Sequence, residues 1–138
     1  MKLVFAIIIL IHGIIHLMGF VKAFQLADIN PVTQSISKPL GMLWLFTALF
    51  FVIAAVLFYL KIEWWFVLAF IAIFISQTLI IIYWKESKFG TLANIIILIP
   101  AILGLATYNF ETAFFEMILL LALPRAITSP LMMLLFAV

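Results

Sequence analysis

The sequence predicts an all-α integral membrane protein: an antiparallel up-down bundle of four transmembrane helices, followed by a short apolar C-terminal segment. Of its 138 residues, 70% are hydrophobic and 9% are charged, whereas a soluble domain is about half apolar and about a quarter charged. Four apolar stretches approach the roughly 20 residues that a helix needs to cross the hydrocarbon core. Most of the connections between them are short, and short connections make consecutive helices antiparallel neighbours.

The first predicted span covers residues 3–24. Lys2 precedes it, and Val21-Lys22-Ala23 resembles a signal-peptide cleavage site, so a cleavable signal peptide is the alternative. The apolar run from Leu3 to Val21 exceeds the roughly 7–15 residues of a signal-peptide core. This length favours an uncleaved membrane span.

The second predicted span covers residues 40–60. It follows the longest polar segment, Gln25–Pro39, in which Pro31 and Pro39 block continuation of the first helix. The segment therefore predicts a loop between the first two spans.

The third and fourth predicted spans cover residues 64–84 and 91–108. Lys61-Ile62-Glu63 forms a tight turn before the third, and the polar run 85–88 precedes the fourth, with Gly90 just before it. Charged residues and glycine in such short connections are typical of turns at the membrane surface.

After Asn109 the pattern changes. Glu111–Leu123 is apolar but too short to span, and Pro124-Arg125 and Ser129-Pro130 interrupt the sequence beyond it. The sequence predicts a four-helix transmembrane domain over residues 1–110 and an interfacial or re-entrant tail over 111–138. It predicts no complete fifth span, and a truncated or aberrant C-terminus is a further alternative.

Two histidines lie within the first span. His12 and His16 are four residues apart and so share one helix face with Gly19 and Ala23. Small residues allow a neighbouring helix to approach closely, and ionisable groups inside membranes usually face the bundle interior. We therefore expect both imidazoles to face other helices.

The spans place polar residues at similar depths. At a rise of ~1.5 Å per residue, His16, Thr47 and Gln77 lie roughly 4–5 Å from the midpoints of their spans, and Asn94 about 7 Å. Because the helices alternate in direction, all these displacements point to the same side of the membrane. The candidate ligand-binding residues form this layer: His12, His16, Thr47, Gln77 and Asn94. We expect His16, Gln77 and Asn94 to contact one another, a shared water or a shared ligand.

The alternative is that these polar residues only join helices. Intramembrane hydrogen bonds of this kind contribute roughly 0.6–2 kcal/mol each. This interpretation is favoured for Thr47, Ser76 and Thr78, whereas the histidines favour a functional site.

The residue inventory narrows the chemistry. The absence of cysteine excludes thiolate catalysis and Cys-ligated metals. His12 and His16 have the spacing of a helical metal-binding pair, but the four spans offer no third ligand. No acid accompanies Ser76 to build a catalytic triad, and two histidines on one face do not suit a haem. We therefore expect neither a metal site nor a catalytic residue.

A net charge of +2 at a pI of about 9.1 suits a lipid bilayer as partner, and we expect no nucleic-acid binding.

The motifs resemble those of known membrane proteins. The residues that carry the resemblance are His12-Gly13-x-x-His16-x-x-Gly19-Phe20 with Lys22-Ala23-Phe24, Pro39-x-Gly41-x-x-Trp44, Ser76-Gln77 and Lys88-Phe89-Gly90-Thr91-x-x-Asn94. Over about residues 1–105 the chain resembles the N-terminal four-helix membrane region of an uncharacterised bacterial family, and more distantly it is similar to DoxX-like proteins. The resemblance implies a bacterial inner-membrane protein, with His12, His16, Gln77 and Asn94 among the motif residues. It implies no established activity, although some DoxX-like proteins are associated with quinone-linked redox chemistry. The apolar sequence after Asn109 departs from the family, in which a soluble domain follows.

Three functions remain open from the sequence. The first is a membrane module that binds a small amphiphile, through a lipid or quinone head group, or that acts as an anchor or scaffold. The second is a quinone-interacting oxidoreductase subunit, which requires a redox partner protein because the chain carries no motif for another cofactor. The third is a small channel or transporter, which a homo-oligomer with a central pore would indicate.

Overall fold

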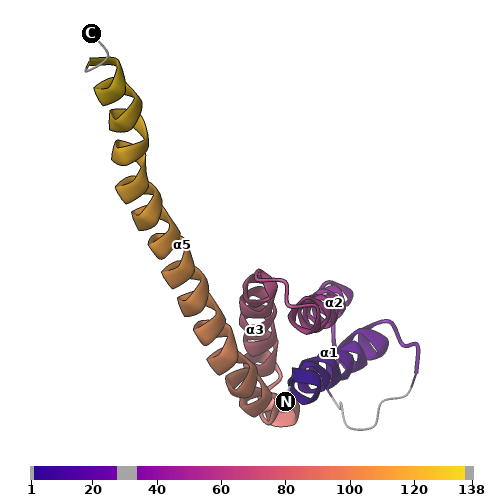
Figure 1. Cartoon of the computed structure of the whole chain (residues 1–138). Coiled ribbons are helices and arrows are strands. Elements are labelled where there is room, and N and C mark those ends of the chain that lie inside the picture. Colours follow the sequence, from indigo (N-terminus) through magenta and orange to yellow (C-terminus); the bar gives the residue numbers. More distant parts are fainter. Residues whose placement is uncertain (1, 28–33, 136–138) are drawn as a thin grey trace. The chain divides into compact units, whose positions relative to one another are not determined.

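The computed structural model describes residues 2–27 and 34–135 (Figure 1). Side chains are described as far as residue 121. The described residues form helices and no strands. The helices are α1 (Lys2–Ala23), α2 (Lys38–Tyr59), α3 (Trp65–Ile82), α4 (Trp84–Ser87) and α5 (Gly90–Leu135).

The all-helical prediction is confirmed for the described residues. Four helices are long and apolar enough to cross a membrane, namely α1, α2, α3 and the Gly90–Leu121 part of α5. Pro39 lies in the first turn of α2, where its missing N–H leaves no intrahelical bond unmade. Pro31 lies outside the described residues.

Two helices end in the same hydrogen-bonded motif. After α1, the N–H of Leu26 donates to Val21 O and that of Gln25 donates to Lys22 O. After α2, the N–H of Ile62 donates to Leu57 O and that of Lys61 to Phe58 O. These bonds satisfy the last helical carbonyls in the Schellman arrangement. Gln25 and Lys61 accordingly adopt positive φ angles of 55° and 60°.

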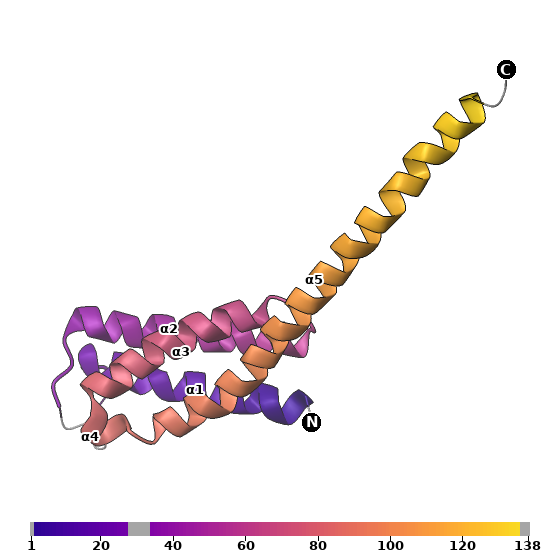
Figure 2. The same cartoon turned by 90° about the vertical axis from the view of Figure 1, so that its left-hand side faces the viewer.

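The third predicted span ends earlier than expected, and an additional short helix follows it. α3 stops at Ile82, and Tyr83 bends the chain with φ −107° and ψ 35°. The Tyr83 carbonyl then accepts from the N–H groups of Glu86 and Ser87, which closes the single turn of α4. Figure 2 shows α4 at the same end of the helices as the end of α1 and the start of α2.

The fourth long helix extends beyond the predicted span of residues 91–108, and the bounds of the membrane crossing within it stay a prediction. α5 continues through Asn109 to Leu135, so the segment after Asn109 is a continuation of the fourth long helix. The sequence between Gly104 and Pro124 contains no glycine or proline that would break a helix. The prolines beyond it remove individual backbone bonds without ending α5, which apolar helices tolerate.

By internal contacts the chain divides into two compact units, Met1–Gly104 and Leu105–Val138. In the second unit, Thr112 donates to Tyr108 O, and the rings of Phe110 and Phe114 stack at 6.2 Å. Residues 136–138, at the end of the predicted tail, lie outside the described part of the chain. Every feature of the candidate site lies in the first unit.

Glycines bring α1 and α2 together in the first unit, where α1, α2 and α3 lie side by side (Figures 1 and 2). A Cβ on Gly13 would lie 2.9 Å from Phe51 Cβ and 3.2 Å from Ala48 O. A Cβ on Gly41 of α2 would overlap the side chain of Ala23. The missing side chains therefore allow the two backbones to approach closely.

Two apolar clusters enclose a polar layer. The first contains Ile9 of α1 and Ile73 of α3, and the second contains Ala23 of α1 and Leu79 of α3. On α1 and α3 the buried polar residues lie between members of these two clusters. Packed apolar side chains thus lie on both sides of the polar residues along α1 and α3.

Candidate functional site

The two histidines face the interior of the first unit, as predicted. His12 and His16 are 4% and 2% exposed. Their rings contact each other edge to face at 4.7 Å, and both pack against Phe51 of α2, at 4.8 and 5.5 Å. The four-residue spacing on α1 places the two rings on one face. Because Gly13 has no side chain, Phe51 of α2 can pack close to α1 beside these rings.

Four buried side chains from three helices form a hydrogen-bonded chain. His12 Nε2 lies 2.9 Å from Asn94 Oδ1 of α5. His16 Nε2 lies 2.9 Å from Ser76 Oγ of α3, and Ser76 Oγ lies 3.1 Å from the same Asn94 oxygen. Asn94 therefore links His12 to Ser76 of α3, whereas His16 bonds Ser76 directly.

The network extends from Asn94 to two half-buried residues. Asn94 Nδ2 and Gln77 Oε1 are 3.1 Å apart, and Gln77 Nε2 and Thr91 Oγ1 are 3.2 Å apart. Of the three residues expected to converge, only Gln77 and Asn94 contact each other. Gln77 contacts Asn94 directly, and His16 reaches Asn94 through Ser76.

Thr47 does not take part in this network. Its side chain is fully buried, but its hydroxyl donates to Leu43 O of the same helix at 2.7 Å. Thr78 donates to Phe74 O in the same way. Hydroxyls that bond to the carbonyl four residues earlier satisfy themselves within one helix, so depth alone did not identify a shared contact for Thr47.

Ser76 and Thr91 both belong to the network, although the sequence places neither among the candidate ligand-binding residues and Thr91 occurs only within a quoted motif. Ser76 is the only described side chain that bonds both His16 and Asn94. Thr91 precedes Asn94 by three residues, a spacing that places both on one helix face. The spacing from Asn94 could therefore have identified Thr91 from the sequence.

Hydrogen-bond chemistry limits where the protons of this network can lie. The His12 carbonyl only accepts, so the contact of 2.9 Å from His16 Nδ1 requires a proton on Nδ1. If Ser76 donates to Asn94, Ser76 must accept from His16 Nε2. His16 then carries two protons and a positive charge.

A neutral His16 satisfies the same contacts when the side-chain amides of Asn94 and Gln77 are each rotated by 180°, which exchanges oxygen and nitrogen. Ser76 then donates to His16 Nε2, and Asn94 presents its NH₂ to Ser76 and His12. Gln77 reverses with Asn94, and Thr91 becomes the donor. Amide oxygen and nitrogen have nearly the same shape, so both arrangements fit the same atomic positions. They differ by one proton.

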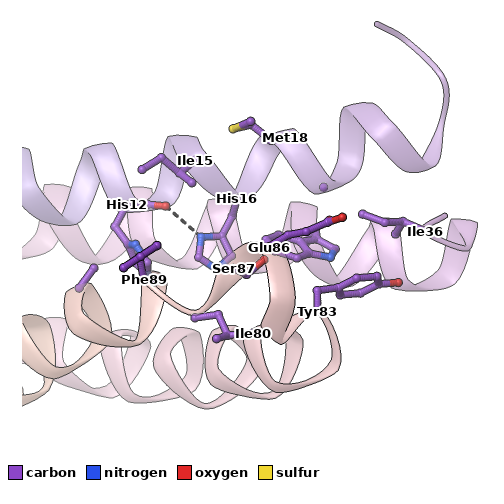
Figure 3. A pocket seen from close by; sticks show the side chains of 14 residues that line it. His12, Ile15, His16, Met18, Ile36, Ile80, Tyr83, Glu86, Ser87 and Phe89 are labelled. Carbon is purple, nitrogen blue, oxygen red and sulfur yellow. Dashed lines mark hydrogen bonds between the residues drawn. The ribbon is translucent and has the colours of Figure 1, made fainter. Parts of the chain in front are cut away.

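A cavity of about 300 Å³ adjoins the histidines (Figure 3). Figure 3 shows His16 extending from α1 toward the side on which Ile80 and Tyr83 lie. Residues from every helix of the first unit line the cavity, most of them apolar. They are His12, Ile15, His16, Met18, Gly19, Ile36, Trp44, Ile80, Tyr83, Glu86, Ser87, Phe89, Gly90 and Ala93.

Trp44 leaves a polar atom unsatisfied beside this cavity. Its side chain is 6% exposed, and its indole Nε1 is buried without a hydrogen-bond partner among the described residues. A buried donor left unpaired costs about 1–3 kcal/mol. The indole lies over Gly19, whose Cβ, if present, would overlap it, and its centre lies 5.1 Å from that of the His16 ring.

The polar groups at the α4 side of the cavity are Tyr83, Glu86 and Ser87. Glu86 Oε1 accepts from the backbone N–H of Gln34 at 3.0 Å. Burial, together with the negative charge of Glu86, raises the pKa of the Tyr83 phenol above its usual value. Tyr83 therefore remains neutral at physiological pH, and the charge at this side of the cavity comes from Glu86.

The site combines an open cavity of about 300 Å³ with side chains whose hydrogen bonds fit two arrangements of protons. Among the described residues, no three His, Cys, Asp or Glu side chains are grouped as metal ligands. Comparison with protein-family models, curated protein sequences and solved structures found no match.

Proposed function

We propose that this chain is an integral membrane protein that binds the head group of a small amphiphile in the cavity beside His12 and His16. One observation carries the proposal: a mostly apolar cavity of about 300 Å³ meets a buried polar network on one wall. Sites for small molecules typically combine apolar walls with a few convergent polar groups.

The surface of the helices supports placement in a bilayer. Large apolar side chains are exposed on each long helix, among them Leu3, Phe74 and Leu92. In water, contiguous apolar surface of this extent would drive association, whereas lipid solvates it. We infer four membrane crossings in alternating directions, and the resemblance to DoxX-like proteins favours the bacterial inner membrane.

The cavity favours ligand binding over a purely structural role. Hydrogen bonds that only join helices need no space beside them, and packed interiors contain few voids larger than a water molecule. Here the two histidines take part in the network and also line the cavity. A head group in the cavity therefore lies beside the most polar side chains of the layer.

A second candidate function is a quinone-interacting subunit of an oxidoreductase. The observation that favours it is the pair of proton arrangements that the His16–Ser76–Asn94 contacts accommodate, because quinone chemistry exchanges protons. This function requires a partner protein that supplies the electrons.

Native mass spectrometry of the full chain in lipid nanodiscs tests the proposal. We expect the protein purified from bacterial membranes to retain a small amphiphile, and His16→Leu to lose it while keeping its helical circular dichroism. Thr78→Leu is the matched control, because Thr78 is exposed and bonds only within α3. Retention of the same molecule by His16→Leu, or no retained amphiphile in the unmodified chain, would refute the proposal.

A further inference from the structure

We infer that the cavity selects an amphiphile with an uncharged, carbonyl-bearing head group, and that Trp44 Nε1 donates a hydrogen bond to its oxygen. This inference rests on the proposed function and specifies its ligand class. Its starting point is the Trp44 indole, which is buried, lines the cavity and has no acceptor for Nε1 among the described residues.

The unsatisfied Trp44 Nε1 indicates which hydrogen-bonding group the ligand must carry. An indole N–H donates and never accepts, so the ligand must bring an acceptor. A primary amine or quaternary ammonium head group brings none and would leave the Trp44 N–H unpaired. A purely cationic head group therefore leaves the Trp44 donor unsatisfied, although it would be attracted to the carboxylate of Glu86.

The charged residues around the cavity indicate which net charge the head group can carry. The described lining residues include the carboxylate of Glu86 and no Lys or Arg. An anionic carboxylate or phosphate would be desolvated there without a counter-ion, beside a like charge. Anionic head groups are therefore excluded, and an uncharged acceptor remains.

His12 adds a second donor in the neutral form of the network. When Asn94 turns its NH₂ toward His12 Nε2, the proton of His12 resides on Nδ1. The hydrogen bond of the His12 ring runs through Nε2 to Asn94, and His12 also lines the cavity, so its Nδ1–H is a candidate donor to a ligand. A carbonyl oxygen has two lone pairs and no proton that needs an acceptor, so it can accept from both Trp44 Nε1–H and His12 Nδ1–H.

Two membrane components offer this chemistry: a prenylated quinone and an uncharged glycerolipid ester. Both carry carbonyl oxygens on an apolar tail. The glycines and apolar side chains of the lining accept the tail of either one.

Titrations of the full chain in nanodiscs test the inference through the indole ¹H–¹⁵N resonances of its tryptophans. The probes are a decyl-substituted benzoquinone, dioctanoylglycerol, decanoate and decylamine. We expect at least one uncharged probe to saturate and to move the Trp44 N–H signal downfield, and we expect the two charged probes not to do so. Which uncharged probe binds more tightly identifies the source of the head group.

Trp44→Phe identifies the Trp44 signal and measures its contribution. We expect it to weaken binding of the uncharged probe by about threefold to tenfold, the value of one hydrogen bond. Trp64→Phe, at an indole that is 68% exposed, is the matched control and should leave binding unchanged. The wild-type Trp44 shift reports on the contact independently of how the variant folds.

The outcomes separate this inference from the proposed function. Saturable binding of decanoate or decylamine, with no binding of the uncharged probes, would overturn the inference and leave an amphiphile site. An uncharged probe that binds without moving the Trp44 signal would overturn the Trp44 contact alone. Failure of all four probes to bind would count against the proposed function and the inference together.

Discussion

The imidazole of His16 is held at both nitrogens: Nδ1 lies 2.9 Å from the His12 carbonyl oxygen, and Nε2 lies 2.9 Å from Ser76 Oγ. A carbonyl oxygen cannot donate, so the proton of a neutral His16 must be on Nδ1. Charging His16 would place an ion among apolar clusters with no carboxylate bonded to it in the described network, which is costly.

We therefore predict that His12 and His16 are both neutral Nδ1–H tautomers at pH 7. ¹⁵N-histidine spectra of the chain in nanodiscs distinguish the two ring nitrogens and measure this directly. An Nε2–H tautomer at His12 would show instead that Asn94 presents its side-chain oxygen to that ring. It would contradict the arrangement in which the Asn94 NH₂ group faces His12.

Ser76→Ala should destabilise the first unit. It removes the partner of His16 Nε2 and one contact of Asn94, and a buried group left unsatisfied costs about 1–3 kcal/mol. Unfolding by SDS titration in mixed micelles measures the loss. Thr78→Ala, at an exposed hydroxyl bonded within its own helix, should change the unfolding free energy by less than about 0.5 kcal/mol. Equal losses in the two variants would contradict the central position of Ser76.

Asn94 and Gln77 should be energetically coupled. Their amides are in contact at 3.1 Å, and residues that share a hydrogen-bond network typically show coupling energies of about 0.5–3 kcal/mol. A double-mutant cycle with Asn94→Ala and Gln77→Ala measures the coupling. The same cycle with Asn94→Ala and Thr47→Val should be additive, because Thr47 bonds to Leu43 O. Coupling to Thr47 as strong as that to Gln77 would argue for a different network.

Gly13→Ala should weaken the contact between α1 and α2. Its new Cβ would lie 3.2 Å from the Ala48 carbonyl oxygen, a backbone atom that cannot rotate away. We expect a loss of about 1–3 kcal/mol, as for other overpacked sites. Gly104→Ala is the matched control. The nearest atoms to its Cβ would be at 3.4–3.5 Å, an ordinary contact, so helix propensity alone should raise stability by up to about 1 kcal/mol. Destabilisation of the same size at both glycines would show that α1 and α2 do not depend on close approach at Gly13.

The sequence predicts depth better than it predicts rotation. The spacing of His12 and His16 and the small residue Gly19 were enough to place the histidines on the inner face of α1. Residues that follow each other in a helix point about 100° apart, so the sequence could not decide whether Ser76 or Gln77 reaches His16. In the structure Ser76 contacts His16 and Gln77 contacts Asn94.

Two other differences have local causes. Thr47 has the expected depth, but its hydroxyl has an acceptor within its own helix, and sequence position does not reveal which acceptor a rotamer selects. The end of the fourth helix was placed by counting the residues needed to cross a membrane. A helix ends where backbone bonding fails, and no residue between Gly104 and Pro124 forces that.

The Trp44 indole of α2 packs directly over Gly19 of α1, so the residue at position 19 limits how large the residue at position 44 can be. A methyl group at position 19 would occupy the volume that the indole fills, so a larger residue there is compatible only with a smaller residue at position 44. In an alignment of related chains, positions 19 and 44 should therefore vary as a pair. Chains that lose both glycine and tryptophan should also lose the free indole donor, and with it the preference for a carbonyl-bearing ligand.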